Sequence, residues 1–384
     1  MNIIDSLRDN ELSPYKIWAQ YEKLLTLAKG GDVCPSTLEL DVFGGCNHFC
    51  RWCVDPAGSH NNAVLDTNVA GLIMKDAYAL GLRGIVFKGG GEPALHPNFA
   101  KILRMAKEIG FDIGVISNGT NLKQLSDAYL DTLAYIRISV DGATPETRKE
   151  IHGVMDFDEL KSAITEFTAK RQKRHPVIGL SFCMEYTQAG EIPHAISLGE
   201  ETSVDYVLIR PIFGEEIGYK PSHSPKEAAL LRTEIVKHAA NYKGDLLVMA
   251  GDWKGDNEFL SGYETPTVSK MTRRDAFVQN QRFNGIEHLT GRCPAAGLIL
   301  VVTADLEVYF CCCTRNLRQF RMGILQYDRN AFTLRDFWES AAYKPQLERL
   351  KHCECLPFCT HPMEKYNKVI EYLSLEQKHH VDFV

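Results

Sequence analysis

Six short apolar runs alternate with helical stretches along the first half of the chain, and this alternation constrains the fold more than any other feature. The runs lie at 38–43, 84–88, 112–117, 135–140, 177–185 and 206–211. Helical apolar spacing occurs between them, at 66–80, 98–109, 122–129, 157–173 and 190–201. Continuous apolar strands separated by helices are typical of a parallel sheet that helices cover. The pattern therefore predicts an α/β fold, a partial (β/α)6 barrel.

The character of the sequence changes on both sides of this barrel, which divides the chain into four parts. These are a helical lead-in at 1–37, the barrel at 38–211, a connecting segment at 212–292 and a C-terminal part at 293–384. The connecting segment shows no clear strand–helix alternation. The C-terminal part contains a predicted hairpin of 298–302 against 307–311, a helix near 333–350 and a cysteine-rich tail. It is expected to form a small α+β domain.

The bulk composition excludes several classes of protein. With 43 Lys and Arg against 49 Asp and Glu, the net charge of the 384 residues is −6, and no basic stripe indicates nucleic-acid binding. Apolar runs such as 295–302 are too short to span a membrane. The N-terminus lacks the basic start and apolar core of a signal peptide. We therefore expect a cytoplasmic protein without nucleic-acid or membrane partners.

Twelve cysteines are many for such a chain, and most of them fall into two groups. In a reducing compartment, such groups indicate metal ligands rather than disulfides. The first group, Cys46, Cys50 and Cys53, directly follows the first predicted strand. Zinc usually takes paired Cys-x2-Cys knuckles with further ligands elsewhere. Three thiolates on one tight loop can instead hold three corners of a cubane 4Fe–4S cluster and leave the fourth iron open.

This Cys-x3-Cys-x2-Cys loop, with the aromatic Trp52 before its last Cys, resembles the radical S-adenosylmethionine (radical SAM) superfamily. A second motif, GGGEP at 89–93, follows the second strand and resembles the glycine-rich motif that receives the amino group of SAM in that family. The resemblance covers roughly residues 36–211. It implies a 4Fe–4S cluster at the three cysteines, and SAM contacts from Trp52, Gly90, Gly91 and Glu92. Barrel active sites lie at the C-terminal ends of strands, where glycines allow close backbone approach.

Polar residues at the ends of later strands extend this predicted cofactor site. Ser117 and Asn118 end the third strand, and Ser139 and Asp141 end the fourth. In the family, such residues often meet the ribose and methionine parts of SAM. Their alternative role is a turn, since Asn-Gly and Asp-Gly are common turn dipeptides. Arg210, at the end of the sixth strand, is expected either to pair with the SAM carboxylate or to form a salt bridge at the barrel rim.

The second cysteine group lies around the predicted C-terminal hairpin. Cys293 and Cys311 flank the hairpin, and Cys355 and Cys359 follow in the tail. This layout resembles the SPASM or twitch extension of radical SAM enzymes, which carries auxiliary iron–sulfur clusters. We predict one auxiliary cluster held by these four cysteines, with Cys353 as the substitute ligand. Two clusters, or a zinc ion, are the alternatives.

The resemblance implies reductive cleavage of SAM to methionine and a 5′-deoxyadenosyl radical, which abstracts hydrogen from an unactivated C–H bond. An auxiliary cluster can accept a second electron, which favours dehydrogenation of an alcohol with Glu185 as a candidate base. Epimerisation is the alternative, with Cys183 on the fifth strand as the hydrogen donor. A flavodoxin- or ferredoxin-type protein is the implied electron donor.

The expected substrate is a small polar molecule such as a sugar, an aminocyclitol or a nucleotide-linked sugar. The 37 residues before the first strand are too few for the peptide-binding domain of peptide-modifying SPASM enzymes. The cysteine arrangement also resembles the aminocyclitol dehydrogenase branch. Two alternatives stay open: a maturase that modifies a ribosomal peptide, and a non-catalytic zinc-binding adaptor that would be colourless and need no SAM.

Overall fold

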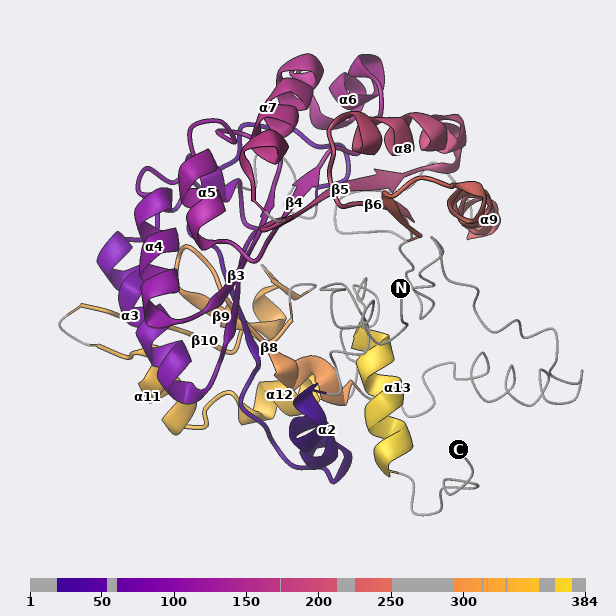
Figure 1. The fold of residues 1–384 in the computed structure, drawn as a ribbon. Coiled ribbons are helices and arrows are strands. Elements are labelled where there is room, and N and C mark those ends of the chain that lie inside the picture. Colours follow the sequence, from indigo (N-terminus) through magenta and orange to yellow (C-terminus); the bar gives the residue numbers. More distant parts are fainter. Residues whose placement is uncertain are drawn as a thin grey trace, which may run out of the picture.

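One curved sheet of ten strands organises the part of the chain that the computed structural model describes (Figure 1). The described residues are 19–53, 61–172, 174–212, 225–250, 293–311, 314–315, 317–328, 331–351 and 363–374. The strands are β1 (Thr37–Leu40), β2 (Gly84–Phe87), β3 (Asp112–Ser117), β4 (Tyr135–Ser139), β5 (Val177–Met184), β6 (Tyr206–Pro211), β7 (Leu247–Ala250), β8 (Ile299–Val302), β9 (Glu307–Tyr309) and β10 (Gly323–Ile324). Their order in the sheet is β10-β9-β8-β1-β2-β3-β4-β5-β6-β7.

Strands β1 to β7 lie in chain order and are all parallel, as the predicted barrel requires. The side chains on one face of the sheet form the core beneath the helices: Ile136 and Ile138 of β4 and Val207 of β6 are fully buried there. Alternate residues face the concave side, because successive side chains of a strand point to opposite faces. The prediction of an α/β partial barrel is confirmed, with β7 as a seventh parallel strand.

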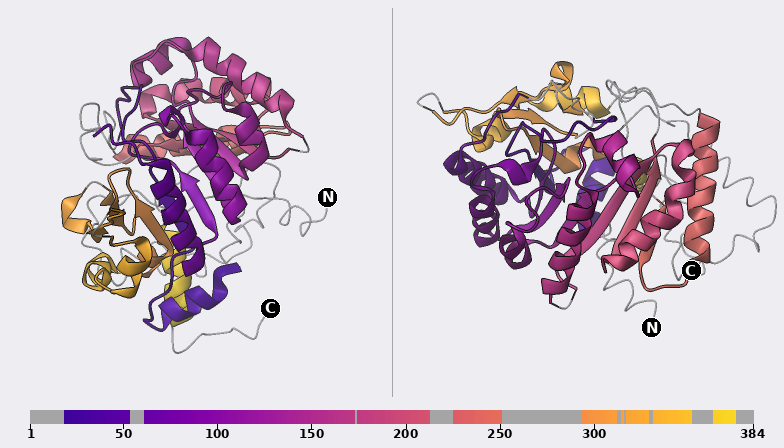
Figure 2. Two further views of the ribbon diagram at one scale, coloured as in Figure 1. Left: turned by 90° about the vertical axis from the view of Figure 1, so that its left-hand side faces the viewer. Right: turned by 90° about the horizontal axis from the view of Figure 1, so that it is seen from above.

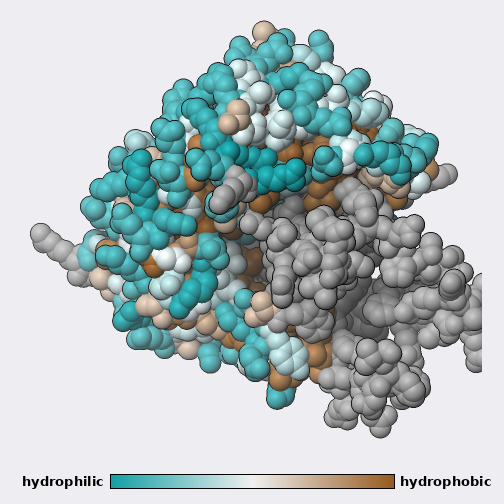
Figure 3. All heavy atoms as spheres, viewed as in Figure 1, coloured by the Kyte–Doolittle hydropathy of each residue, from teal (hydrophilic) through white to brown (hydrophobic). Residues whose placement is uncertain are grey.

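Helices connect the parallel strands and cover the convex face of the sheet (Figure 1; Figure 2). They are α3 (Thr67–Leu80), α4 (Phe99–Ile109), α5 (Ser126–Thr132), α6 (Pro145–His152), α7 (Phe157–Lys170), α8 (Ile192–Glu201) and α9 (Pro225–Asn241). The segments before β1 and after β10 add α2 (Tyr21–Ala28), α11 (Leu334–Glu339), α12 (Lys344–Lys351) and α13 (Met363–Ser374), and α13 packs against α2. Local signals set their bounds, as in α3. There the Asp66 carboxylate accepts from the backbone N–H of Asn68 and Val69, and Gly81 ends the helix at φ 103°. Hydrophilic side chains predominate on the outer helices (Figure 3).

Two regions contain more regular structure than the sequence predicted. Helix α6 follows β4 and has its N-cap signal, since the Thr144 side chain accepts from the N–H of Thr147. Ile151 is the one aliphatic residue of this helix, so the apolar periodicity that would mark a helix is missing. The interval 212–292, interpreted as a connecting segment, contains α9 and β7, and β7 pairs in parallel with β6.

The C-terminal segment joins the same sheet. The predicted hairpin is confirmed, because β8 and β9 pair antiparallel. Strand β8 also pairs in parallel with β1, with Leu300 opposite Leu38. The one helix expected near 333–350 is two helices, α11 and α12, and Ala341 between them has a φ of 54°. The division of the chain into four parts at the predicted boundaries remains a prediction.

The described helices include none that is both long and apolar enough to cross a membrane. Five of the C-terminal cysteines lie outside the described residues, namely Cys312, Cys313, Cys353, Cys355 and Cys359.

Candidate active site

The loop after β1 carries the first cysteine group at the carboxyl end of the parallel strands. Backbone hydrogen bonds fix it: the N–H of Gly44 donates to the O of Ala63 (2.8 Å), and that of Cys53 to the O of Cys50 (3.2 Å). All three thiols of the group are partly buried. Burial raises the pKa of Cys46 and of Cys50, so these sulfurs need a nearby cation to become thiolates. An iron–sulfur cluster supplies that charge, and the donor set fits one.

The GGGEP turn after β2 packs directly on this loop. The N–H of Glu92 donates to the O of Gly45 (2.8 Å). A Cβ added at Gly91 would lie 1.8 Å from that same oxygen, so a side chain at position 91 cannot fit. Gly89 and Gly90 have φ values of 71° and 62°, in the left-handed region that favours glycine. The two predicted motifs are therefore in backbone contact.

Glu92 joins the ends of β2 and β3. Its side chain is buried, and one carboxylate oxygen accepts from the Ser117 hydroxyl (2.8 Å) and the Ala94 N–H (3.0 Å). The other oxygen accepts from the N–H of Asn118 (2.7 Å). Burial raises the pKa of Glu92 to about 7, although these three donors favour the carboxylate. The geometry gives Glu92 and Ser117 a positioning role, and their contact with SAM remains a prediction.

Asn118 and Asp141 extend from the ends of β3 and β4 to the cysteine loop. Nδ2 of Asn118 lies 3.9 Å from Sγ of Cys46. One oxygen of Asp141 accepts from the N–H of Cys183 (2.8 Å), and the other from Nε2 of His152 (3.0 Å). Burial alone would raise the pKa of Asp141, but the hydrogen bond from His152 helps to lower it overall. Asp141 thus ties β5 to the cysteine loop through His152.

Two buried histidines, to which the sequence assigned no role, surround Cys50. Nδ1 of His152 lies 3.5 Å from the Cys50 sulfur and 3.0 Å from Nδ1 of His48. The ligand atoms of all three side chains lie within 4.8 Å of one another. Because the Asp141 carboxylate accepts from Nε2 of His152, the neutral ring offers Nδ1 as an acceptor to Nδ1–H of His48. Burial, and the repulsion that would arise if His48 and His152 were both protonated, lower the pKa of His48 to about 4.

Arg148 is fully buried behind this network and was also missed by sequence reasoning. Its Nε and Nη2 donate to the two oxygens of Asp156 (2.6 and 2.9 Å). Its remaining N–H groups lie near carbonyl oxygens at the ends of β3 and β4, those of Asn118, Ser139 and Val140. Arg148 therefore fixes the two strand ends that carry predicted SAM-binding residues. Only long-range pairing reveals this role, because Arg148 lies in a polar stretch of the sequence without apolar periodicity.

Cys183 and Arg210 meet on the concave face at the ends of β5 and β6. They are register partners, and Nε of Arg210 donates to Sγ of Cys183 (3.0 Å). Cys183 also packs against a buried apolar cluster of Trp52, Ile151 and Ile212, and Trp52 belongs to the cysteine loop. Glu185 is buried, with a carboxylate oxygen 4.0 Å from Nη2 of Arg51 in the same loop. The fold therefore brings Cys183, Arg210 and Glu185 close to the cysteine loop.

Buried ion pairs line the ends of β1 and β2. Lys88 pairs with Glu39 at 2.8 Å. Asp41 pairs with Arg315 of the C-terminal segment at 3.5 Å, with both side chains almost fully buried. A Cβ added at Gly89 would lie 1.5 Å from Nη1 of Arg315. The C-terminal segment therefore contacts the GGGEP turn, which no local sequence pattern predicted.

The structure describes two of the four predicted auxiliary ligands. Cys293 precedes the 3-10 helix η5 (Pro294–Leu298), and Cys311 follows β9. The N–H of Cys293 donates to the O of Lys351 (2.6 Å), and Nδ2 of Asn367 donates to the Cys293 sulfur (3.2 Å). Lys351 immediately precedes the segment with the tail cysteines. Cys355 and Cys359 lie outside the described residues, so their role as ligands remains a prediction.

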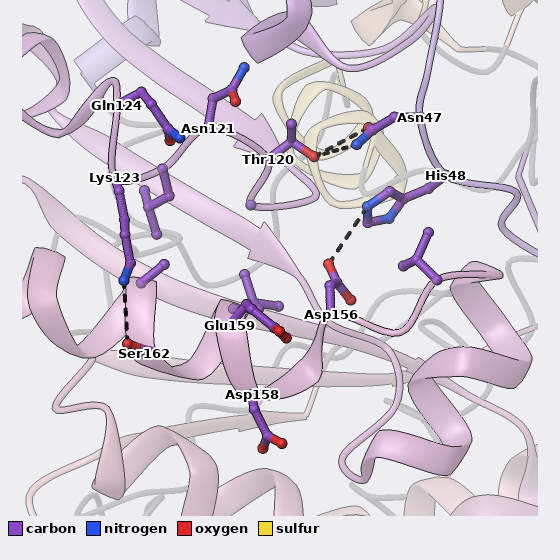
Figure 4. Close-up of a pocket in the computed structure, with 15 residues that line it drawn as sticks. Asn47, His48, Thr120, Asn121, Lys123, Gln124, Asp156, Asp158, Glu159 and Ser162 are labelled. Atoms are coloured by element: carbon purple, nitrogen blue, oxygen red, sulfur yellow. Dashed lines mark hydrogen bonds and ion pairs between the residues drawn. The ribbon is translucent and has the colours of Figure 1, made fainter.

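A cavity of about 670 Å³ opens on the outer side of the cysteine loop (Figure 4). Asn47 and His48 of the loop form one wall, and the others are formed by residues 119–124, Val154, Asp156, 158–160 and 162–163. The Asn47 side chain exchanges hydrogen bonds with the Thr120 hydroxyl, and Nε2 of His48 lies 3.8 Å from Asp156. This cavity lies beside the loop and is separate from the concave face of the sheet.

The sequence model of the radical SAM superfamily matches residues 40–197, which include both motifs. The chain carries a radical SAM domain. This match agrees with the predicted cofactors, a 4Fe–4S cluster and SAM, and it favours iron over zinc at the first cysteine group.

Two relatives share this domain at moderate identity. An S-adenosylmethionine-dependent nucleotide dehydratase of Selenomonas ruminantium is 28% identical over 33% of this chain and 49% of its own length. A probable GTP 3′,8-cyclase of Saccharolobus islandicus is 28% identical over 51% of this chain and 72% of its own length. The chain thus spans about half the length of the first relative.

Solved structures of radical SAM proteins share the fold over most of the chain. SuiB of Streptococcus suis with S-adenosylmethionine superposes with a TM-score of 0.62 at 13% identity, covering 95% of this chain and 80% of SuiB. The protein anSMEcpe gives a TM-score of 0.54 at 17% identity, with 85% and 88% covered. At sequence identities this low, the similarity shows a shared fold and nothing further.

Proposed function

We propose that this radical SAM enzyme cleaves SAM reductively and abstracts hydrogen from a small polar substrate, in a net dehydrogenation. The observation that carries the proposal is the backbone contact between the three-cysteine loop and the GGGEP turn, at Gly45 and Gly91. When bound, the first cluster and SAM supply the 5′-deoxyadenosyl radical, and an auxiliary cluster supplies an electron acceptor. A ferredoxin- or flavodoxin-type donor and a cytoplasmic location are part of the proposal.

Different residues of this chain would hold each of these cofactors. Cys46, Cys50 and Cys53 would hold the first cluster, with the Asp141–His152 hydrogen bond orienting the ring beside Cys50. The GGGEP turn offers backbone groups to SAM. Among the described residues the Ser139 hydroxyl makes no hydrogen bond, which supports its predicted contact with SAM. Arg210 would contact SAM from the opposite side of the barrel.

Support for an auxiliary cluster comes from the position of Cys293. Its backbone is bonded to Lys351, and Cys355 follows Lys351 by four residues in the sequence. This proximity supports a shared site for Cys293, Cys311, Cys355 and Cys359.

Epimerisation remains the second proposal for the same site, because Cys183 lies on the concave face and packs against the cluster that contains Trp52. A thiol there could donate hydrogen to a substrate radical from the barrel interior. Glu185 is less suited to act as a base, since it is buried against Arg51 of the cysteine loop. The Cys183→Ala variant separates the two reactions: epimerisation requires the thiol, whereas dehydrogenation survives its loss.

The names of the relatives support a small polar substrate. One relative is a nucleotide dehydratase and the other a probable GTP cyclase. A peptide is the second candidate, because SuiB was crystallised with its precursor peptide and anSMEcpe with peptides. The charged concave face described below favours the small molecule.

Anaerobic reconstitution tests the proposal directly. Wild-type protein should bind about eight irons, four for each of the two proposed clusters, and should release methionine and 5′-deoxyadenosine from SAM with dithionite. Replacing Cys46, Cys50 and Cys53 by Ala should abolish SAM cleavage, whereas the matched Cys34→Ala variant should retain it. Cys34 lies apart from the site and donates to the O of Leu80. A wild-type protein without iron at the loop, or without SAM cleavage, would refute the proposal.

Replacing Cys355 and Cys359 by Ala tests the auxiliary site separately. This variant should lose about four irons and keep SAM cleavage, but it should stop forming an oxidised product. Normal product formation by the variant would show that the auxiliary site does not accept the electron.

A further inference from the structure

The concave face of the sheet carries a cation that the cofactor site does not use. Arg137 lies on β4 between the fully buried Ile136 and Ile138, which face the helices, so its own side chain faces the barrel interior. It is partly buried. Within the described part of the chain it makes no ion pair and no hydrogen bond. The other cation on this part of the face, Lys88, pairs with Glu39.

Two tyrosines, Tyr135 and Tyr206, lie beside Arg137 on the concave face. Gly179 is the register partner of both Arg137 and Tyr206, and a Cβ added at Gly179 would lie 2.0 Å from the Tyr206 ring. On the other side, a Cβ added at Gly114 would lie 2.3 Å from the ring of Tyr135. Each ring therefore lies over a glycine of the neighbouring strand. Burial raises the pKa of both tyrosines, and the Arg137 charge opposes this shift in each, so the guanidinium is near both rings.

The position of Arg137 along β4, below the predicted SAM contact Ser139, also suits the binding of a substrate. Ser139, the predicted SAM contact, lies two residues further along β4 on the same face, which is about 6.6 Å along a strand. A molecule held at Arg137 would extend toward the carboxyl ends of the strands, where the cysteine loop lies. A partly buried cation without a counter-charge is unfavourable unless a ligand supplies one.

We propose that Arg137 binds an anionic group of the substrate, a phosphate or a carboxylate, inside the barrel. The guanidinium presents a planar set of donors that matches both groups in a two-pronged geometry. This inference rests on the proposed function and narrows its substrate class to anionic small molecules. The Tyr135 and Tyr206 hydroxyls are further donors at the same level of the barrel.

Calorimetric binding of simple anions to the anaerobically reconstituted protein with SAM tests this assignment. Pyrophosphate represents the phosphate source and succinate the carboxylate source. One of the two should bind with a Kd of about 1 mM or tighter, and the tighter one identifies the group. Arg137→Met should weaken that binding by about 10-fold or more. Arg137→Lys keeps the charge but not the planar set of donors. Its affinity for the anion should therefore lie between those of wild type and Arg137→Met.

The matched control is Arg104→Met. Arg104 is exposed on α4, so this variant should bind the anion as tightly as wild type does. Iron content and far-ultraviolet circular dichroism verify folding of each variant, and Arg137→Lys carries the test if Arg137→Met does not fold. Absence of anion binding, or equal binding by wild type and the Arg137 variants, overturns the assignment. If wild type cleaves SAM but binds neither anion, only this inference fails. If it binds an anion but does not cleave SAM, the proposed function fails instead.

Discussion

Gly91→Ala is the sharpest test of the site, because the structure gives the size of the conflict. The added Cβ would lie 1.8 Å from the O, 2.4 Å from the C and 2.7 Å from the N of Gly45. All three atoms belong to the backbone, so no rotamer change relieves the overlap. An ordinary contact starts near 3.4 Å, so the turn and the cysteine loop must separate by about 1.6 Å.

This separation would break the hydrogen bond from Glu92 N–H to the O of Gly45 and move the neighbouring Cys46. Overpacking of this kind typically costs about 1–3 kcal/mol. Because both segments belong to the proposed SAM and cluster site, the affinity for SAM should fall by about 10-fold or more, and the iron content after reconstitution should fall with it. Equilibrium dialysis with labelled SAM and iron analysis measure these effects.

Gly190→Ala is the matched control, because a Cβ at Gly190 would meet no atom within 4 Å. It should keep wild-type iron content and SAM affinity. If Gly91→Ala also keeps both, the contact between the two motifs does not form the cofactor site, and the geometric reasoning is wrong.

Two further predictions concern buried charges near the site. Arg148→Met should lower the free energy of unfolding in urea by about 3 kcal/mol, because the carbonyl oxygens at the ends of β3 and β4 lose their buried donor. Lys161→Met, which breaks an exposed ion pair, should change the free energy of unfolding by less than about 1 kcal/mol. Equal losses of stability in the two variants would contradict the reasoning. The raised pKa of Glu92 predicts that its contribution to stability is present below pH 4.5 and lost as the pH rises through about 7. Relative to Glu92→Gln, wild type should therefore lose about 3 kcal/mol over that interval, and a difference independent of pH would refute the shift.

The strands of the barrel could be predicted because each is a short apolar run with turn residues after it. The same holds for the two motifs, whose residues are consecutive in the sequence. Helix α6 was missed because apolar periodicity is absent from it, and β7 because the sequence of 212–292 shows no clear alternation of strands and helices around it. The parallel pairing of β8 with β1 joins segments about 260 residues apart, and no local pattern encodes such a partner.

The supporting residues of the site show the same limit. Glu92 was predicted from its motif, but its hydrogen bonds to Ser117 and Asn118 depend on how β2 and β3 pair. His152 and Arg148 belong to a polar helix, and only the folded chain brings them to Cys50 and Asp156. Arg137 was invisible for another reason: an arginine in a strand carries no signal until the pairing of its neighbours is known.

The ladder between β1 and β8 has a mechanical consequence. The strand that leads into the first cysteine loop and the strand between Cys293 and Cys311 are held by consecutive interstrand bonds. Neither strand can move relative to the other without breaking these bonds, so the spacing between the proposed first cluster and the proposed auxiliary cluster would stay constant through a catalytic cycle. Electron transfer between them would then be governed by that constant gap, and a change in the protein's conformation would be a poor means of switching it.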